Sequence, residues 1–324
     1  MTRADTANAL RLPSLGFGGS AIGNLFQATS DDDAARTIEA AWEAGIRYFD
    51  TAPHYGLGLS ERRLGEALRA HPRSEYVLST KVGRLLLPAA TTGRDDDGFD
   101  VAAAHHRVRD YSANGVRRSL EASLERLGLD RIDIVLIHDP DDHIDEAIEQ
   151  AAPALSALRA EGTIRSYGAG MNQSAPLTRF VRETDADVVM IAGRYSLLDQ
   201  TAARDLLPAA LRRGVGVINA GVFNSGLLAL PEPRPGATYD YRPASTALVE
   251  RAHHLARVCQ EFGVDLPTVA LTFAAHHPAI VSVVVGLRSP EEVADAVQRR
   301  AQPIADGIWT ALREQDLIDD CIDS

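Results

Sequence analysis

The sequence predicts an α/β fold, a (β/α)8 barrel of the TIM type, made by one domain over residues 1–324 with long loops at the carboxyl-terminal mouth. Short apolar runs alternate with amphipathic stretches, and eight such strand and helix pairs can be counted. No shift in composition and no low-complexity tract divides the chain. Eight alternating units in a chain of 324 residues favour a closed parallel barrel over an open sheet.

Helix start and stop residues mark the units of the first half. Ser30 with three aspartates behind it is a typical helix N-cap, and Gly45 is a typical residue after a helix end. Ser112 and Gly128 bracket a later helix in the same way. The expected strands are 12–19, 46–50, 76–80 and 132–137, and the expected helices begin near residues 30, 60, 112 and 144.

The second half keeps the alternation. Expected strands cover 163–170, 188–192, 215–220 and 281–285, with helices over 174–183, 201–212, 245–262, 267–275 and 290–297. Two long connections interrupt the pattern, 85–111 without a convincing period and 221–243 rich in Pro, Gly and Tyr. Loops of this length in a compact domain usually carry function.

Composition narrows the class of partner. Forty-five acidic residues against 33 Lys and Arg give a net charge of −12, which argues against nucleic acid or an anionic membrane as partner. No apolar run approaches the ~20 residues of a membrane span, and the first residues lack the apolar core of a signal peptide. We expect a cytoplasmic protein with a small-molecule substrate; the oligomeric state is left open. Cys259 and Cys321 form no metal or disulfide motif, so no metal is expected.

Three expected strands end on Asp50, Lys81 and His138, and Tyr55 follows the first of them after a proline. Side chains at the carboxyl ends of barrel strands converge on one mouth, where active sites lie. Each residue alone has a structural alternative, such as a helix cap or a core aromatic. The repeated placement of polar residues at strand ends favours the interpretation that Asp50, Tyr55, Lys81 and His138 form one catalytic group.

The chemistry of such a group follows from its charges. A phenol has a pKa of about 10, and a nearby cation favours its ionised form. Lys81 would supply that cation to Tyr55, Asp50 would keep Lys81 charged, and a neutral His138 would donate a hydrogen bond to a reacting oxygen.

The stretches F-D-T-A-P-H-Y-G, S-T-K-V-G and L-I-H-D-P, in this order, resemble the aldo-keto reductases. The resemblance covers nearly the whole chain. It implies a barrel that binds a nicotinamide cofactor without a Rossmann domain, and hydride transfer between substrate and cofactor. It also implies Tyr55 as proton donor or acceptor, tuned by Lys81 and Asp50, with His138 orienting the substrate oxygen.

The resemblance also implies cofactor contacts. The asparagine that holds the carboxamide corresponds to Asn172, and the usual stacking aromatic is missing, so Phe223 or Tyr195 is expected to replace it. Glu292 stands where NADP-preferring members carry an arginine, which favours NAD, while Arg288 leaves NADP possible. The expected cofactor-binding residues are Gly19, Asn172, Phe223, Asn224, Ser225, Gly226, Leu227, Gly286, Arg288 and Glu292.

Within the family, A-G-R-Y-S-L-L-D-Q and G-V-F-N-S-G-L-L resemble members that oxidise L-fucose and other D-threo-aldoses at C1 to the lactone, and also pyridoxal 4-dehydrogenases. The residues expected in the substrate pocket are Asn24, His54, Tyr195 and Phe223, together with the connection 85–111. The alternatives are a general NADPH-dependent aldehyde reductase and a non-catalytic nicotinamide-sensing module.

Overall fold

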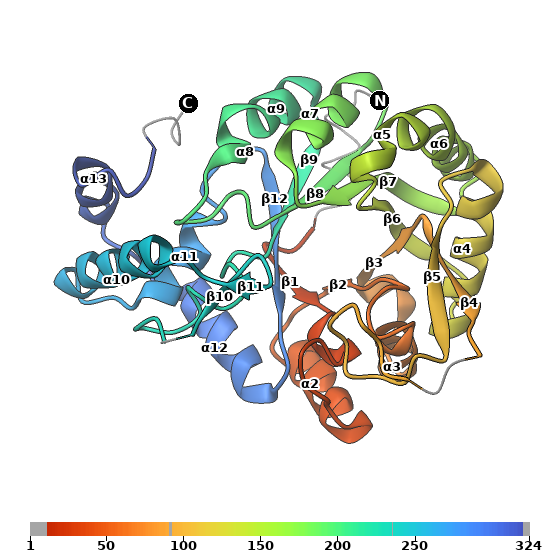
Figure 1. Ribbon diagram of the computed structural model, residues 1–324, viewed down its shortest axis with the longest axis horizontal. Helices are drawn as coiled ribbons and strands as arrows, with labels where there is room; N and C mark the ends of the chain where they lie inside the picture. Colours follow the sequence, from red (N-terminus) through yellow and green to blue (C-terminus); the bar gives the residue numbers. More distant parts are fainter. Residues whose placement is uncertain (1–11, 91–92, 235, 320–324) are drawn as a thin grey trace.

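A closed barrel of eight parallel strands forms the centre of the computed structural model, which describes residues 12–90, 93–234 and 236–319 (Figure 1). The predicted (β/α)8 fold is confirmed. Cys321 and the segment 1–11 lie outside the described residues. The barrel strands, in chain order, are β1 (Leu15–Gly18), β2 (Tyr48–Asp50), β3 (Val77–Val82), β6 (Ile132–His138), β7 (Ile164–Met171), β8 (Val188–Ala192), β9 (Gly216–Ala220) and β12 (Ile280–Gly286).

The barrel closes where β1 pairs with both β2 and β12. The order around it is β1, β12, β9, β8, β7, β6, β3 and β2, so each strand lies beside the next barrel strand of the sequence. All eight carboxyl ends therefore meet at one mouth.

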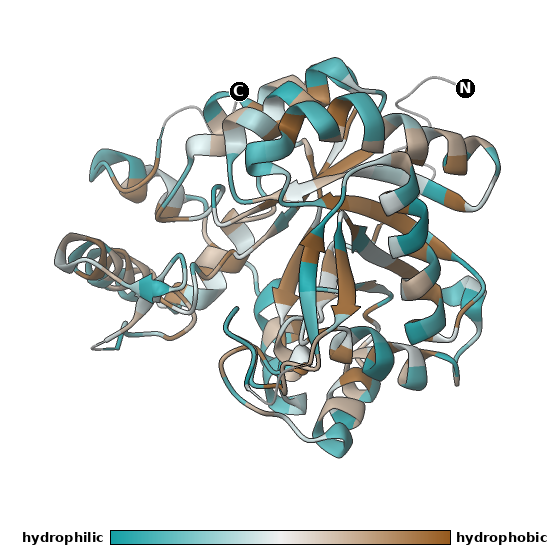
Figure 2. Cartoon of the chain, turned by 45° about the vertical axis from the view of Figure 1, so that its right-hand side comes forward, coloured by the Kyte–Doolittle hydropathy of each residue, from teal (hydrophilic) through white to brown (hydrophobic). Residues whose placement is uncertain are grey.

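Helices surround the barrel, with apolar faces inward and polar faces outward (Figure 2). Ser30, Ser112 and Ser245 each cap a helix by accepting from a backbone N–H, which accounts for the predicted starts. A π-helical turn, Ala147–Ala151, joins α5 (Ile144–Glu146) to α6 (Ala152–Ala160). The helices are α2 (Asp31–Glu43), α3 (Leu59–Leu68), α4 (Ala113–Leu127), α5 (Ile144–Glu146), α6 (Ala152–Ala160), α7 (Ser174–Glu183), α8 (Thr201–Arg204), α9 (Leu206–Arg213), α10 (Thr246–Glu261), α11 (Leu266–Phe273), α12 (Pro290–Ala301) and α13 (Gly307–Glu314). None of these described helices is long and apolar enough to cross a membrane.

Two apolar layers hold the barrel together. The larger lies between strands and helices, and a smaller cluster fills the barrel interior with Tyr48, Ile134, Leu136, Val188, Met190, Ile218 and Val284. Because side chains alternate along a strand, the inward row of Ile134 and Leu136 continues to His138, and that of Tyr48 to Asp50. The strand pleat itself thus turns two of the polar strand ends toward the barrel axis.

The connection 85–111 is more regular than predicted. Its ends form an antiparallel pair, β4 (Arg84–Pro88) with β5 (His105–Arg109). The described part of its tip contacts the first loop, which is the loop that follows β1, where Phe26 N donates to Gly98 O at 2.8 Å. The expectation of an irregular loop was wrong for these ends. Their sequences show no strong alternation of apolar and polar residues, so the sequence gives no sign of the pairing between them.

The connection 221–243 also contains a small hairpin, β10 (Thr238–Tyr239) with β11 (Arg242–Pro243). Its two turn residues, Asp240 and Tyr241, have φ values of 48° and 62°, as a type I′ turn requires. A tyrosine in left-handed backbone is unfavourable, so this tip is held by its surroundings.

Candidate active site

Asp50, Lys81 and Tyr55 form one connected group at the mouth. Lys81 Nζ lies 2.7 Å from Asp50 Oδ2 and 3.0 Å from Tyr55 Oη, and it also donates to the carbonyl oxygen of Thr51 at 3.0 Å. The second oxygen of Asp50 accepts from Ser79 Oγ at 2.6 Å. Every donor of the ammonium group therefore has an acceptor, and the phenol is one of them.

Gly19 lets the first strand approach this group closely. Its N–H donates to Asp50 O at 2.8 Å, and a Cβ at Gly19 would lie 2.8 Å from that same oxygen. The predicted cofactor residue Gly19 thus also supports the strand end that carries Asp50.

The protonation of the group reflects burial opposed by charge. Burial raises the pKa of Tyr55 to about 12, although Lys81 lowers it. Burial acts to lower the pKa of Lys81, but Asp50 and Tyr55 outweigh it and raise that pKa. Tyr55 is therefore a protonated phenol at neutral pH, held beside a fixed cation.

His138 faces Tyr55 across the same cavity. The two rings are perpendicular with centroids 5.9 Å apart, and the His54 ring lies 5.4 Å from that of His138. Burial, with Arg84 and Lys81 adding to it, places the pKa of His138 well below its usual value. A neutral imidazole can donate one hydrogen bond without carrying charge.

Two joined cavities open above these residues. The catalytic cavity, of about 510 Å³, is lined by Asp50, His54, Tyr55, Lys81 and His138. The second cavity, of about 500 Å³, extends from there to the first turn of α12 and is lined by Phe223, Asn224, Arg288 and Glu292. Asn172 and Gly286 line both, so the two form one elongated cleft.

A family model described as the aldo/keto reductase family matches residues 14–316. The chain belongs to the aldo/keto reductase family. It is 46% identical to D-threo-aldose 1-dehydrogenase from Pseudomonas sp over 97% of each chain, and 39% identical to pyridoxal 4-dehydrogenase from Microbacterium luteolum over 98% of this chain and 97% of that one. The solved glycerol dehydrogenase of Gluconobacter oxydans has the same fold, with a TM-score of 0.76 at 24% identity over 95% and 94% of the two chains.

Aldo-keto reductases are oxidoreductases that use nicotinamide cofactors, and the elongated cleft of this chain fits such a group. Asn224 is only 3% exposed; its Nδ2 donates to Gly193 O at 3.1 Å, while its Oδ1 lies buried without a partner in the described part of the chain. An unpaired buried acceptor on the cleft wall suits a hydroxyl or amide donor of a bound molecule. Ser225 and Gly226, with φ values of 57° and 95°, continue the same turn along the cleft.

Three predicted contact residues lie away from the cleft. Tyr195 is fully buried and stacks on Phe273 at 5.0 Å, so it is a core residue. Leu227 points into the apolar core, although its neighbours line the cleft. Asn24 binds Thr29 N, Arg63 Nη1 and Asp100 O, and so fastens the first loop behind the wall that Leu25 and Phe26 form.

Other residues of the mouth were not predicted. Tyr241 and Phe26 line both cavities, are each 58% exposed, and face one another with ring centroids 6.0 Å apart. Asp139 lines the catalytic cavity and was not predicted either, whereas Phe99, which also lines it, belongs to the connection 85–111 that was expected at the pocket. Asp139 could have been suspected, because it directly follows His138 in the sequence, whereas the loop around Tyr241 carries no comparable signal.

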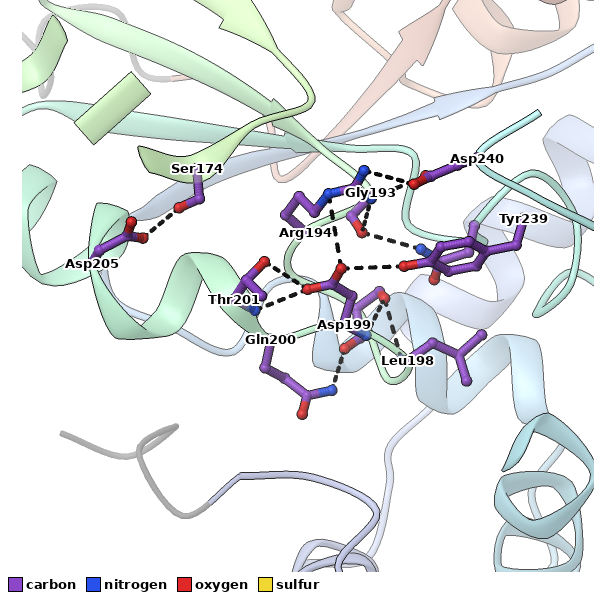
Figure 3. Close-up of polar contacts among 12 residues, drawn as sticks. Ser174, Gly193, Arg194, Leu198, Asp199, Gln200, Thr201, Asp205, Tyr239 and Asp240 are labelled. Atoms are coloured by element: carbon purple, nitrogen blue, oxygen red, sulfur yellow. Dashed lines mark hydrogen bonds and ion pairs between the residues drawn. The ribbon is translucent and has the colours of Figure 1, made fainter. Parts of the chain in front are cut away.

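The tip that carries Tyr241 is fastened by charge. Figure 3 shows Arg194 against Asp240 and Asp199, with Asp240 at 3.0 and 2.7 Å from its two terminal nitrogens. Tyr239 donates to Asp199 at 3.1 Å. These contacts hold the left-handed turn and keep the Tyr241 ring over the junction of the two cavities.

Proposed function

We propose that this aldo-keto reductase is an aldose 1-dehydrogenase that oxidises a D-threo-aldose such as L-fucose at C1 to its lactone, with NAD as the favoured cofactor. The observation that carries the proposal is the contact of Tyr55 with Lys81 in a cavity whose other walls include the polar side chains of His54 and Asp139. Polar walls beside a proton-transfer group suit a substrate rich in hydroxyls. The 46% identity to a D-threo-aldose 1-dehydrogenase supports the same substrate class.

In the proposed reaction, the substrate C1 hydroxyl lies between Tyr55 and His138. Tyr55, once ionised beside Lys81, accepts the hydroxyl proton, and His138 donates a hydrogen bond to the same oxygen. The C1–H bond breaks with its electron pair as C1=O forms. When bound, the nicotinamide supplies the hydride acceptor.

The choice of NAD rests on two side chains of the cleft. Arg288 donates to Leu25 O at 2.7 Å, to Gln27 O at 2.9 Å and to Thr29 Oγ1 at 3.3 Å, so much of its donor capacity is already used. Glu292 accepts from Arg288 N through Oε2 at 2.7 Å, and its carboxylate would repel a 2′-phosphate. Arg288 thus supports the first loop, and Glu292 favours ribose hydroxyls.

A second candidate is pyridoxal 4-dehydrogenase. The aromatic rings of Phe99, Phe26 and Tyr241 at the mouth favour a flat ring as substrate, as does the relative at 39% identity.

Initial rates of reduced-cofactor formation test these alternatives, with NAD+ or NADP+ against L-fucose, D-arabinose, L-galactose and pyridoxal. Oxidation of the aldoses with NAD+ supports the proposal. Oxidation of pyridoxal alone supports the second candidate. Reduction of simple aldehydes with NADPH, without oxidation of any of the four, would instead indicate a general reductase. Cofactor binding with no turnover at all would indicate a sensing module.

A further inference from the structure

Asp139 has a backbone conformation that its surroundings impose. Its φ is 41°, in the left-handed region that non-glycine residues rarely adopt. Its N–H donates to Gly170 O at 2.9 Å, and its carbonyl oxygen accepts from the Tyr111 hydroxyl at 3.0 Å. Backbone strain held in this way at a cavity wall is a reason to look for a function of the side chain.

The side chain of Asp139 is fixed through one of its two oxygens. Oδ2 accepts from Arg84 Nη2 at 2.6 Å and lies 3.5 Å from His138 Nε2. Within the described ranges, these contacts leave Oδ1 without an assigned donor. The side chain is 26% exposed and lines the catalytic cavity. A fixed carboxylate therefore offers an acceptor oxygen beside the group that orients the substrate.

The acceptor oxygen of Asp139 lies close to the place where the reacting atoms of the substrate would be held. Tyr55 and His138 would hold the oxygen of the carbon that is oxidised, and Asp139, whose Oδ2 lies 3.5 Å from His138 Nε2, lines the same cavity. The hydroxyl on the neighbouring carbon of an aldose would then fall beside Asp139. A carboxylate accepts hydrogen bonds and donates none, so it suits a hydroxyl at that place, and one of its oxygens lacks that donor if the hydroxyl is missing.

We propose that Asp139 is a specificity-determining residue, whose carboxylate accepts a hydrogen bond from the substrate hydroxyl on the carbon next to the one that is oxidised. The proposal rests on the proposed aldose oxidation. It names the feature by which the site would distinguish a 2-hydroxy aldose from substrates without that hydroxyl. A hydrogen bond to a charged group predicts a preference of about 10- to 100-fold in kcat/KM.

The experiment compares D-arabinose with 2-deoxy-D-ribose, which differs from it only by the missing C2 hydroxyl. Both are assayed with NAD+ and wild-type, Asp139→Asn and Asp139→Gly proteins. Asn and Gly both tolerate positive φ, so the backbone is retained while the charge or the whole side chain is removed. Asp142→Asn is the matched control, because it removes an exposed carboxylate from the same connection, outside the cavity.

The expected result is a 10- to 100-fold preference for D-arabinose in the wild type and the Asp142 control, which shrinks to within a few-fold in both Asp139 variants. Equal losses on the two sugars would overturn the proposal and assign Asp139 to the support of His138 and Arg84. An unchanged preference would also overturn it. If the wild type oxidises neither sugar, the proposed function itself fails, an outcome distinct from the other two. Titration of each variant with reduced cofactor, followed by fluorescence, verifies that the cleft is intact.

Discussion

Lys81 Nζ lies 3.0 Å from Tyr55 Oη, although the two side chains come from different barrel strands and connections. Burial favours the neutral phenol and raises the pKa of Tyr55 to about 12, while Lys81 opposes that effect. The contact with Lys81 therefore stabilises above all the ionised form of Tyr55, which the proposed aldose oxidation requires.

We expect kcat/KM for aldose oxidation to rise with pH between 6 and 9, by up to about tenfold per unit, because the phenolate fraction increases below the pKa of Tyr55. Aldehyde reduction uses the protonated phenol and should change little over the same range. Lys81→Met should lower oxidation at pH 7 by about 10²- to 10⁴-fold and shift the profile to higher pH. Steady-state rates in both directions provide the measurement. Tyr55→Phe, the matched loss of the hydroxyl alone, should remove the rise; an oxidation rate that falls toward pH 9 would contradict the assignment.

Glu292→Gln should narrow the proposed preference for NAD over NADP, because the substitution keeps the size of the side chain and removes a charge that would face a 2′-phosphate. A roughly tenfold gain in NADPH affinity, which corresponds to about 1.4 kcal/mol, is expected with little change for NADH. Fluorescence titration with NADH and NADPH measures both. Tighter binding of NADPH than of NADH by the wild type would refute the preference for NAD over NADP.

The pKa of His54 predicts a loss of stability in acid. Burial, with Arg84 and Arg107 adding to it, lowers this pKa to about 2, whereas the unfolded chain has a value near 6.5. The unfolded state then binds more protons between these values, so the free energy of unfolding falls as the pH drops below 6.5.

His54→Gln should therefore flatten the dependence of the urea midpoint on pH between 6.5 and 4. His106→Gln, at an exposed position of β5, serves as the control and should leave the slope unchanged. Identical slopes for His54→Gln and the wild type would show that His54 does not carry the effect.

Gly168 in β7 is a position where the barrel admits no side chain. A Cβ there would overlap the carbonyl oxygen of Val188, a backbone atom that cannot rotate away. Gly168→Ala should lower the free energy of unfolding by about 1–3 kcal/mol or more. Gly170→Ala, on the same strand, places its Cβ 3.5 Å from Met190 and should cost less. Thermal unfolding of the two variants compares them, and equal midpoints would contradict the packing described here.

Much of the barrel could be predicted because its signals are local. Ser30 and Ser112 cap helices through their own neighbours, and each apolar run with a polar end is a strand. The convergence of the candidate catalytic residues could be predicted for the same reason, since parallel strands carry Asp50, Lys81 and His138 to one mouth.

The cleft walls could not be predicted in the same way, because they depend on contacts between distant segments. The sequence placed Tyr195 in the substrate pocket, but in the structure its ring stacks on Phe273 of α11. Tyr241 lies at the mouth on a hairpin that contacts from distant segments hold, among them the ion pair of Arg194 with Asp240. The side-chain oxygen of Asn24 accepts hydrogen bonds from Thr29 N and Arg63 Nη1. No local pattern in the sequence indicates these contacts.

Deuterium labelling at C1 tests whether the enzyme transfers the C1 hydrogen of an aldose to the nicotinamide cofactor. The enzyme is incubated with NAD+ and L-fucose or D-arabinose deuterated at C1, and the reduced cofactor and sugar product are analysed by mass spectrometry. We expect one deuterium in the reduced cofactor and an aldonolactone or its hydrolysed acid as product. Reduced cofactor without deuterium, or a sugar oxidised at another carbon, would contradict it.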